Sequence, residues 1–153
     1  MRFPSGFASL TNLVRFFLIN CNKCQHLPPL DQFHSLKLLY LNKLDSLEYI
    51  SERDNSREFS DSSFLPSLEE PALYNCPNPR GWWPRESSTF DFMAENHLRP
   101  LFPLLFKVCI RECHKLTSMP LFPPLENLEL HYCSFKPMGQ KTRIAKVASS
   151  LYQ

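Results

Sequence analysis

The apolar residues near the start of the chain recur at intervals of two and three positions. They are Leu10, Leu13, Phe16, Leu18, Cys21, Cys24, Leu27 and Leu30. A helix requires a period near 3.6 and a strand a period of 2, so neither element alone explains this spacing. The spacing instead predicts a short strand, a turn and an irregular extended return.

Four further segments align with this unit on its pair of apolar residues two positions apart. The aligned pairs are Phe16 and Leu18, Leu39 and Leu41, Pro71 and Leu73, Val108 and Ile110, and Leu128 and Leu130. Five copies exceed the three or so that a stacked repeat needs for a continuous core. The pattern therefore predicts an α/β leucine-rich-repeat solenoid of about five irregular repeats, with a parallel strand ladder on its concave face.

The spacing between copies divides one predicted domain, residues 1–153, into repeats and insertions. Repeats are expected at about 10–30, 33–50, 64–83, 101–122 and 123–135, and insertions at about 51–63 and 84–100. Apolar residues near the C-terminus then follow a period near 3.6, which predicts a capping helix over about 140–152. No comparable cover precedes the first repeat, so its strand is expected to be an open apolar edge, as if the natural domain had continued before it.

Pro71 stands at the first apolar strand position of the third repeat. Proline has no N–H to donate and is poorly tolerated in a central strand. We therefore expect the third repeat to be the weakest.

The six cysteines allow two interpretations, a zinc site or buried thiols. Cys21 and Cys24 have the spacing of zinc ligands, and the other ligands could come from Cys109, Cys113, His114, His131 and Cys133. The repeat register offers a simpler explanation, because four cysteines share the position three residues after the second strand residue: Cys21, Cys76, Cys113 and Cys133. We therefore expect no metal, reduced thiols in buried turn positions, and an outward-facing Cys109 that reacts readily.

Composition argues against several functions. The formal charge is +2, from 17 Lys and Arg against 15 Asp and Glu of scattered sign, which disfavours nucleic acid or an anionic membrane as partner. The longest apolar run near the N-terminus is far shorter than the roughly 20 residues of a membrane span. Three glycines, at positions 6, 81 and 139, cannot form a phosphate-binding loop, and no nucleophile elbow or metal-binding helix motif occurs. We expect neither an enzyme nor a cofactor.

A binding surface remains, and the register predicts which residues form it. Strand side chains alternate between faces, so the neighbours of each buried pair point outward on the concave face. Aromatic and arginine side chains are enriched at the centres of protein contacts. On these grounds the candidate contact residues are Phe17, Tyr40, Tyr74, Arg111, His131 and Tyr132.

The amino-acid sequence of the repeats also resembles that of a known family. The phrases INCNKCQHLPPL and RECHKLTSMP are similar to the C-terminal leucine-rich-repeat region of plant nucleotide-binding disease-resistance proteins of the coiled-coil type. The resemblance covers nearly the whole chain. It implies a non-catalytic recognition module from a cytoplasmic immune receptor of the defense response. The implied partners are a pathogen effector or host protein and, within the parent protein, a nucleotide-binding domain.

Because the chain lacks the nucleotide-binding loop of that family, we expect a fragment of such a receptor. Two alternatives remain, a leucine-rich-repeat substrate adaptor of the ubiquitin type and a non-functional truncated gene product. In the full-length transcript, an upstream coiled-coil and nucleotide-binding region, a short helical adaptor motif, or an early stop would distinguish the three.

Overall fold

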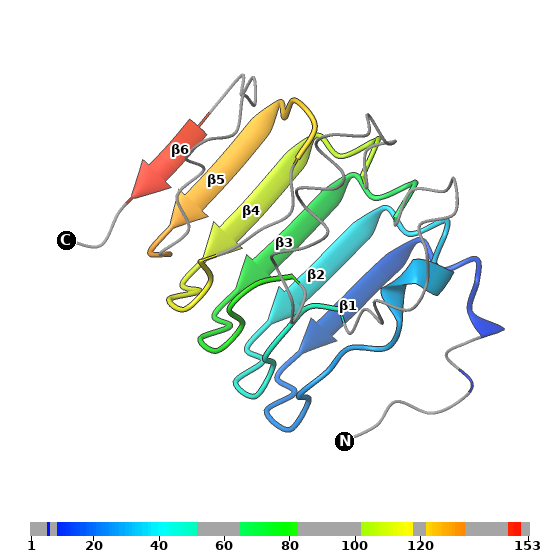
Figure 1. Cartoon of the computed structure of the whole chain (residues 1–153), viewed down its shortest axis with the longest axis horizontal. Coiled ribbons are helices and arrows are strands. Elements are labelled where there is room, and N and C mark those ends of the chain that lie inside the picture. The colour runs from blue at the N-terminus through cyan, green and yellow to red at the C-terminus, as the bar shows by residue number, and fades with distance from the viewer. Residues whose placement is uncertain are drawn as a thin grey trace, which may run out of the picture.

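The computed structural model describes residues 6, 9–51, 65–82, 102–117 and 122–133, together with the backbone of 147–150. These residues form a six-stranded sheet and one short 3-10 turn, η2 (Leu30–Gln32). The strands are β1 (Arg15–Ile19), β2 (Leu38–Asn42), β3 (Glu70–Tyr74), β4 (Lys107–Arg111), β5 (Asn127–His131) and β6 (Val147–Ser150). Figure 1 shows them side by side in sequence order, and every neighbouring pair is parallel.

The register aligns the apolar columns of successive strands. The second strand leucine of one repeat lies opposite that of the next, as Leu18 does to Leu41 and Leu41 to Leu73. Because each column stays on one face of the sheet, the columns stack into a continuous core. Leu41, Leu73 and Ile110 are 0% exposed. The predicted leucine-rich-repeat solenoid is therefore confirmed.

Backbone hydrogen bonds also join the extended return segments to one another. The N–H of Glu48 donates to the carbonyl of Gln25 at 3.3 Å, and the N–H of Arg80 to that of Glu48 at 3.2 Å. The N–H of Thr117 continues the series by donating to the carbonyl of Arg80 at 3.1 Å. The first four repeats are thus held to one another on both the strand side and the return side.

Pro71 lies within β3, and the pairing of β3 with β4 is short. The register to β4 begins at Ala72 and has three residue pairs, whereas β1 and β2 share five. The N–H of Asn75 points toward β4, where it donates to the carbonyl of Arg111. Because N–H groups alternate in direction along a strand, the nitrogen of Pro71 also faces β4 and has no hydrogen to donate. The greater weakness of this repeat stays a prediction.

The prediction of a C-terminal helix is wrong where the structure describes that segment. Val147–Ser150 form β6, which pairs with β5 from Leu128 to His131. The edge of β5 offers unpaired N–H and C=O groups, and pairing them outweighs the helical period of a segment with a β-branched valine and two serines. The rest of 140–152, the insertion at 84–100 and all of 51–63 except residue 51 lie outside the described residues.

None of the helical segments that the structure describes is both long enough and apolar enough to cross a membrane.

Candidate protein-contact surface

A row of aromatic rings crosses the concave face of the first three strands. Phe17 and Tyr40 are register partners on β1 and β2, and their ring centroids lie 5.6 Å apart. The ring of Tyr74, on β3, lies 5.3 Å from that of Tyr40. Aromatic pairs at such separations attract each other, so the three side chains hold one another in place.

A charged pair continues the row across β4 and β5. The guanidinium carbon of Arg111 lies 5.8 Å from the ring centroid of Tyr74, and Nη2 donates to Oε2 of Glu129 at 3.1 Å. This hydrogen bond lowers the pKa of the Glu129 carboxyl group and raises the pKa of Arg111. We call the five residues Phe17, Tyr40, Tyr74, Arg111 and Glu129 the concave stripe.

Two asparagine side chains fix the position of Tyr40 within the concave stripe. Nδ2 of Asn42 donates to the hydroxyl oxygen of Tyr40 at 3.2 Å, and Nδ2 of Asn75 donates to Oδ1 of Asn42 at 3.3 Å. Asn42 is thereby held from both ends. A ring that is already oriented loses less conformational freedom when a partner binds.

The predicted contact residues differ in how far they reach solvent. Phe17 is 54% exposed and Tyr132 is 40% exposed. Arg111 is also exposed, whereas Tyr40, Tyr74 and His131 are half-buried. The structure brings four of the six together in the concave stripe, while His131 is the register partner of Arg111 and Tyr132 follows the end of β5.

Glu129 is a member of the concave stripe that the sequence did not single out. The register places Glu129 opposite Cys109, and therefore diagonally across from Arg111 on the neighbouring strand. Opposite charges on adjacent strands of one face are a recognisable stabilising pair. This diagonal pairing of opposite charges could have identified Glu129 from the aligned repeats alone.

The expectation that Cys109 is open to solvent is wrong, and with it the reason for expecting the thiol to react readily. Its side chain does face the concave side, but it is only 3% exposed. The hydroxyl of Tyr74 donates to Sγ at 3.1 Å, and Sγ lies 3.5 Å from Oε2 of Glu129. Burial is the main cause that raises the pKa of the Cys109 thiol, and burial likewise raises the pKa of Tyr74. The alternation of strand side chains places Cys109 on the concave face, but the larger side chains of Tyr74 and Glu129 cover it.

The turn position after the strands holds buried thiols, as predicted for Cys76, Cys113 and Cys133. Sγ of Cys76 lies 3.3 Å from the carbonyl oxygen of Tyr74, and Sγ of Cys113 lies 3.4 Å from that of Arg111. Hydrogen bonding with Cys76, followed by burial, raises the pKa of Cys113. Both thiols therefore contact the turn backbone, and the raised pKa of Cys113 makes it a poor nucleophile.

The first repeat departs from the prediction of reduced thiols. Cys21 and Cys24 form a disulfide, with their Cα atoms 5.6 Å apart. The N–H of Cys24 donates to the carbonyl of Cys21 in a tight turn, which brings the two Cα atoms within disulfide range. The part of the chain that the structure describes contains no group of three or more His, Cys, Asp or Glu side chains arranged to hold a metal ion.

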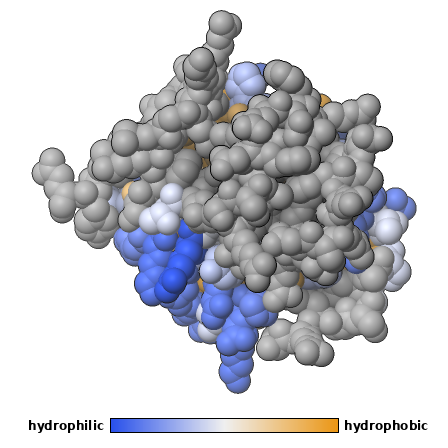
Figure 2. Space-filling view, in the orientation of Figure 1, coloured by the Kyte–Doolittle hydropathy of each residue, from blue (hydrophilic) through white to orange (hydrophobic). Residues whose placement is uncertain are grey.

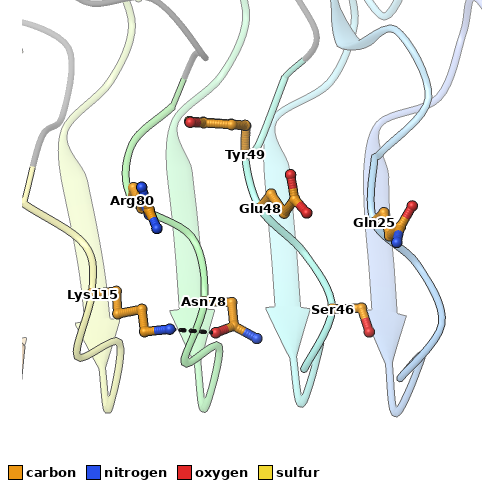
Figure 3. Close-up of a pocket in the computed structure, with 7 residues that line it drawn as sticks. All are labelled: Gln25, Ser46, Glu48, Tyr49, Asn78, Arg80 and Lys115. Atoms are coloured by element: carbon orange, nitrogen blue, oxygen red, sulfur yellow. Dashed lines mark hydrogen bonds between the residues drawn. The ribbon is translucent and has the colours of Figure 1, made fainter.

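A polar groove of about 480 Å³ lies on the return side (Figure 3). Its lining residues are Gln25, Ser46, Glu48, Tyr49, Asn78, Arg80 and Lys115. Nζ of Lys115 donates to Oδ1 of Asn78 at 3.0 Å, so part of the lining is already satisfied. Figure 2 likewise shows strongly hydrophilic residues gathered at the edge where the strands end in turns. The concave stripe, by contrast, combines exposed aromatic surface with a fixed charge.

Comparison with known proteins agrees with this architecture. A family model described as R13L1/DRL21 LRRs matches residues 1–44. The chain is 29% identical over 140 residues, 86% of its length, to "Putative disease resistance RPP13-like protein 1" of Arabidopsis thaliana. It spans 12% of the length of that relative. No solved structure matches. The repeat register and the parallel ladder show a leucine-rich-repeat region, and its two similarities are to a leucine-rich-repeat family and to a plant disease-resistance protein.

Proposed function

We propose that the concave face of this solenoid is a non-catalytic protein-recognition surface of a plant immune receptor, or of a fragment of one, that acts in the cytoplasm during the defense response. Its partner is a pathogen effector or a host protein, and in a longer receptor the nucleotide-binding domain is a further partner. The observation that carries the proposal is the concave stripe.

The stripe has the chemistry of a contact centre. The ring of Phe17 is 54% exposed, and covering its apolar surface with a partner would be favourable. Tyr40 and Tyr74 offer apolar faces with hydroxyl groups, and Arg111 offers a charge that Glu129 already orients. Such aromatic and arginine side chains carry most of the binding energy in many protein interfaces.

The thiol on the same face is not suited to act as a nucleophile. Cys109 lies against Tyr74 and Glu129 of the concave stripe, and burial raises the pKa of its thiol. The thiolate is the nucleophilic form, so a raised pKa leaves Cys109 protonated at neutral pH.

Photo-crosslinking can identify the partner. We expect that p-benzoyl-phenylalanine in place of Tyr40 will crosslink a plant or pathogen protein that mass spectrometry then identifies. The same substitution at Arg80, in the polar groove on the return side, is the matched control and should give no such product. Equal crosslinking from both positions would argue against a concave contact surface. Fractionation of plant cells expressing the chain should recover the crosslinked complex in the cytosol.

Substitution then measures the energetic role of the stripe. We expect Tyr40→Ser together with Arg111→Ser to weaken binding of the identified partner by at least about tenfold, because each is a candidate hot spot. Arg80→Ser together with Lys115→Ser, on the return side, should leave the Kd unchanged. Circular dichroism melting must show both double variants folded. A folded concave variant with unchanged affinity would exclude the proposal.

A further inference from the structure

The first strand of the solenoid has an exposed apolar edge. Within the described part of the chain, β2 is the sole strand paired with β1. Among the residues that the structure describes, six large hydrophobic side chains are exposed, and four of them belong to the first repeat. These four are Leu10 at 45%, Val14 at 43%, Phe17 at 54% and Ile19 at 50%.

The core is also incomplete at this end. Leu13 and Leu18 are half-buried, whereas their counterparts in the second repeat, Leu36 and Leu41, are 0% exposed. Positions that are fully buried in the second repeat are therefore partly exposed to solvent in the first repeat. A surface that covers β1 must therefore bring apolar side chains as well as backbone partners.

The direction of the backbone groups shows which of them are open. The N–H of Asn20 donates forward to the carbonyl of Asn42 in the second repeat. Because direction alternates along a strand, the even-numbered residues of β1 face β2, and Arg15, Phe17 and Ile19 face the open edge. The strand runs from Arg15 to Ile19, so Phe17 is its midpoint.

We propose that two copies of the chain associate through β1, antiparallel across a two-fold axis at Phe17. In this arrangement Phe17 lies opposite Phe17 of the partner subunit, and Arg15 lies opposite Ile19 of the partner subunit. Every second residue of an antiparallel pair exchanges both N–H and C=O hydrogen bonds, so all the open groups of β1 are satisfied.

A second copy suits this edge because the edge is complementary to itself. The open residues are symmetric about Phe17, and no like charges lie directly opposite because Arg15 faces an isoleucine. On the core side, Leu18 lies beside Phe16 of the partner subunit, which extends the incomplete column. On the concave side, the aromatic rows of both copies join at Phe17. A two-fold contact of this kind closes at two copies.

Sedimentation velocity on the full chain tests the association. The expected mass rises with concentration from 17.9 kDa toward twice that value. Phe17→Pro removes an N–H that faces the open edge and leaves the ladder to β2 intact, so it should weaken dimerisation by at least about tenfold. Phe17→Ala is the matched control, because it removes the same ring and keeps the N–H, and it should weaken the dimer less. A monomer at every concentration, a species larger than a dimer, or equal effects of the two variants would overturn the proposal.

A disulfide test locates the two-fold axis even if Phe17→Pro fails to fold. Hydrogen-bonded residues in an antiparallel pair have Cα atoms about 5.5 Å apart, which a disulfide can bridge. Phe17→Cys should therefore form a covalent dimer under mild oxidation, seen on a non-reducing gel. Tyr40→Cys, one strand further in and about 14 Å from its symmetry mate, should not. Equal crosslinking or none would place the contact elsewhere, for example on a further repeat unit, and overturn the two-fold pairing. Neither assay uses a binding partner, so its failure leaves the proposed recognition function untouched.

Discussion

The residue that follows each of the first five strands has a left-handed backbone. The φ angles are 58° at Asn20, 55° at Lys43, 51° at Asn75, 54° at Glu112 and 51° at Tyr132. This conformation turns the chain from the strand into the return, so it recurs once per repeat. Asparagine tolerates it well, whereas other L-residues are disfavoured there by roughly 1–2 kcal/mol. Two repeats have the favoured residue and three do not.

Replacing one of the disfavoured residues should stabilise the protein. Glu112 is exposed, and no hydrogen bond or ion pair joins its side chain to another residue that the structure describes. We expect Glu112→Asn to raise the free energy of unfolding by about 0.5–1 kcal/mol, measured by urea denaturation. Glu126→Asn, an exposed position without positive φ, is the control and should give no gain. A loss of stability at position 112 would contradict the role assigned to the turn.

Cys109 permits a second test at the scale of single residues. It is 3% exposed and its pKa is raised by burial, so iodoacetamide should modify it slowly in the folded protein. Tyr74→Ala removes the hydroxyl that covers Sγ and should speed alkylation of Cys109 by at least about tenfold, read by peptide mass spectrometry. Tyr40→Ala, which opens the same face without touching Cys109, should not. Fast labelling of the unsubstituted protein would show that the cover is absent.

For the strands, the sequence predicted position and register correctly wherever the equivalent residues of successive repeats have the same environment. Spacing alone placed Phe16 and Leu18 in the first strand and aligned Leu18 with Leu41, and both placements are confirmed. It could not reveal that Tyr74 covers Cys109, because that contact depends on side-chain size across two strands. Nor did a helical period near Val147 predict β6, since the unpaired edge of β5 competes with local preference.

The short pairing between β3 and β4 can be tested by restoring the missing donor. Pro71 is buried and its nitrogen faces β4. Pro71→Val provides an N–H at that edge and keeps an apolar side chain of similar size. We expect the free energy of unfolding to rise by about 1 kcal/mol, measured by urea denaturation. The same change at Pro124, which is exposed and outside any strand, is the control. No gain at position 71 would mean that the proline does not weaken the ladder.

The ion pair that joins β4 to β5 predicts a pH dependence. The hydrogen bond from Arg111 lowers the pKa of Glu129 in the folded state. The stabilisation is therefore complete above the unfolded pKa of about 4.3 and is lost as the pH falls through the lower folded value. Arg111→Gln should reduce stability at pH 7 by at most about 1 kcal/mol, since the pair is exposed, and the two proteins should converge in acid. A constant difference at all pH values would exclude an electrostatic origin.

At the scale of the whole molecule, a residue's position in the stack sets its energetic role. Each repeat contacts only its neighbours, so an inner repeat is covered on both sides and an end repeat on one. Leu41, in the second repeat, is 0% exposed, while Leu18, in the same column of the first repeat, is half-buried. The same leucine-to-alanine change should therefore have different costs at the two positions.

We expect Leu41→Ala to lower the free energy of unfolding by about 3 kcal/mol and Leu18→Ala by about 1 kcal/mol at protein concentrations where the chain is monomeric. Urea denaturation at several concentrations provides the measurement. Association through β1 would cover Leu18, so the cost of Leu18→Ala should rise with concentration toward that of Leu41→Ala. The cost at Leu41 should stay constant apart from the shared gain from dimerisation. Equal costs at low concentration would mean that the first repeat is already sealed within the single chain, which would leave β1 without an edge for a second copy to cover.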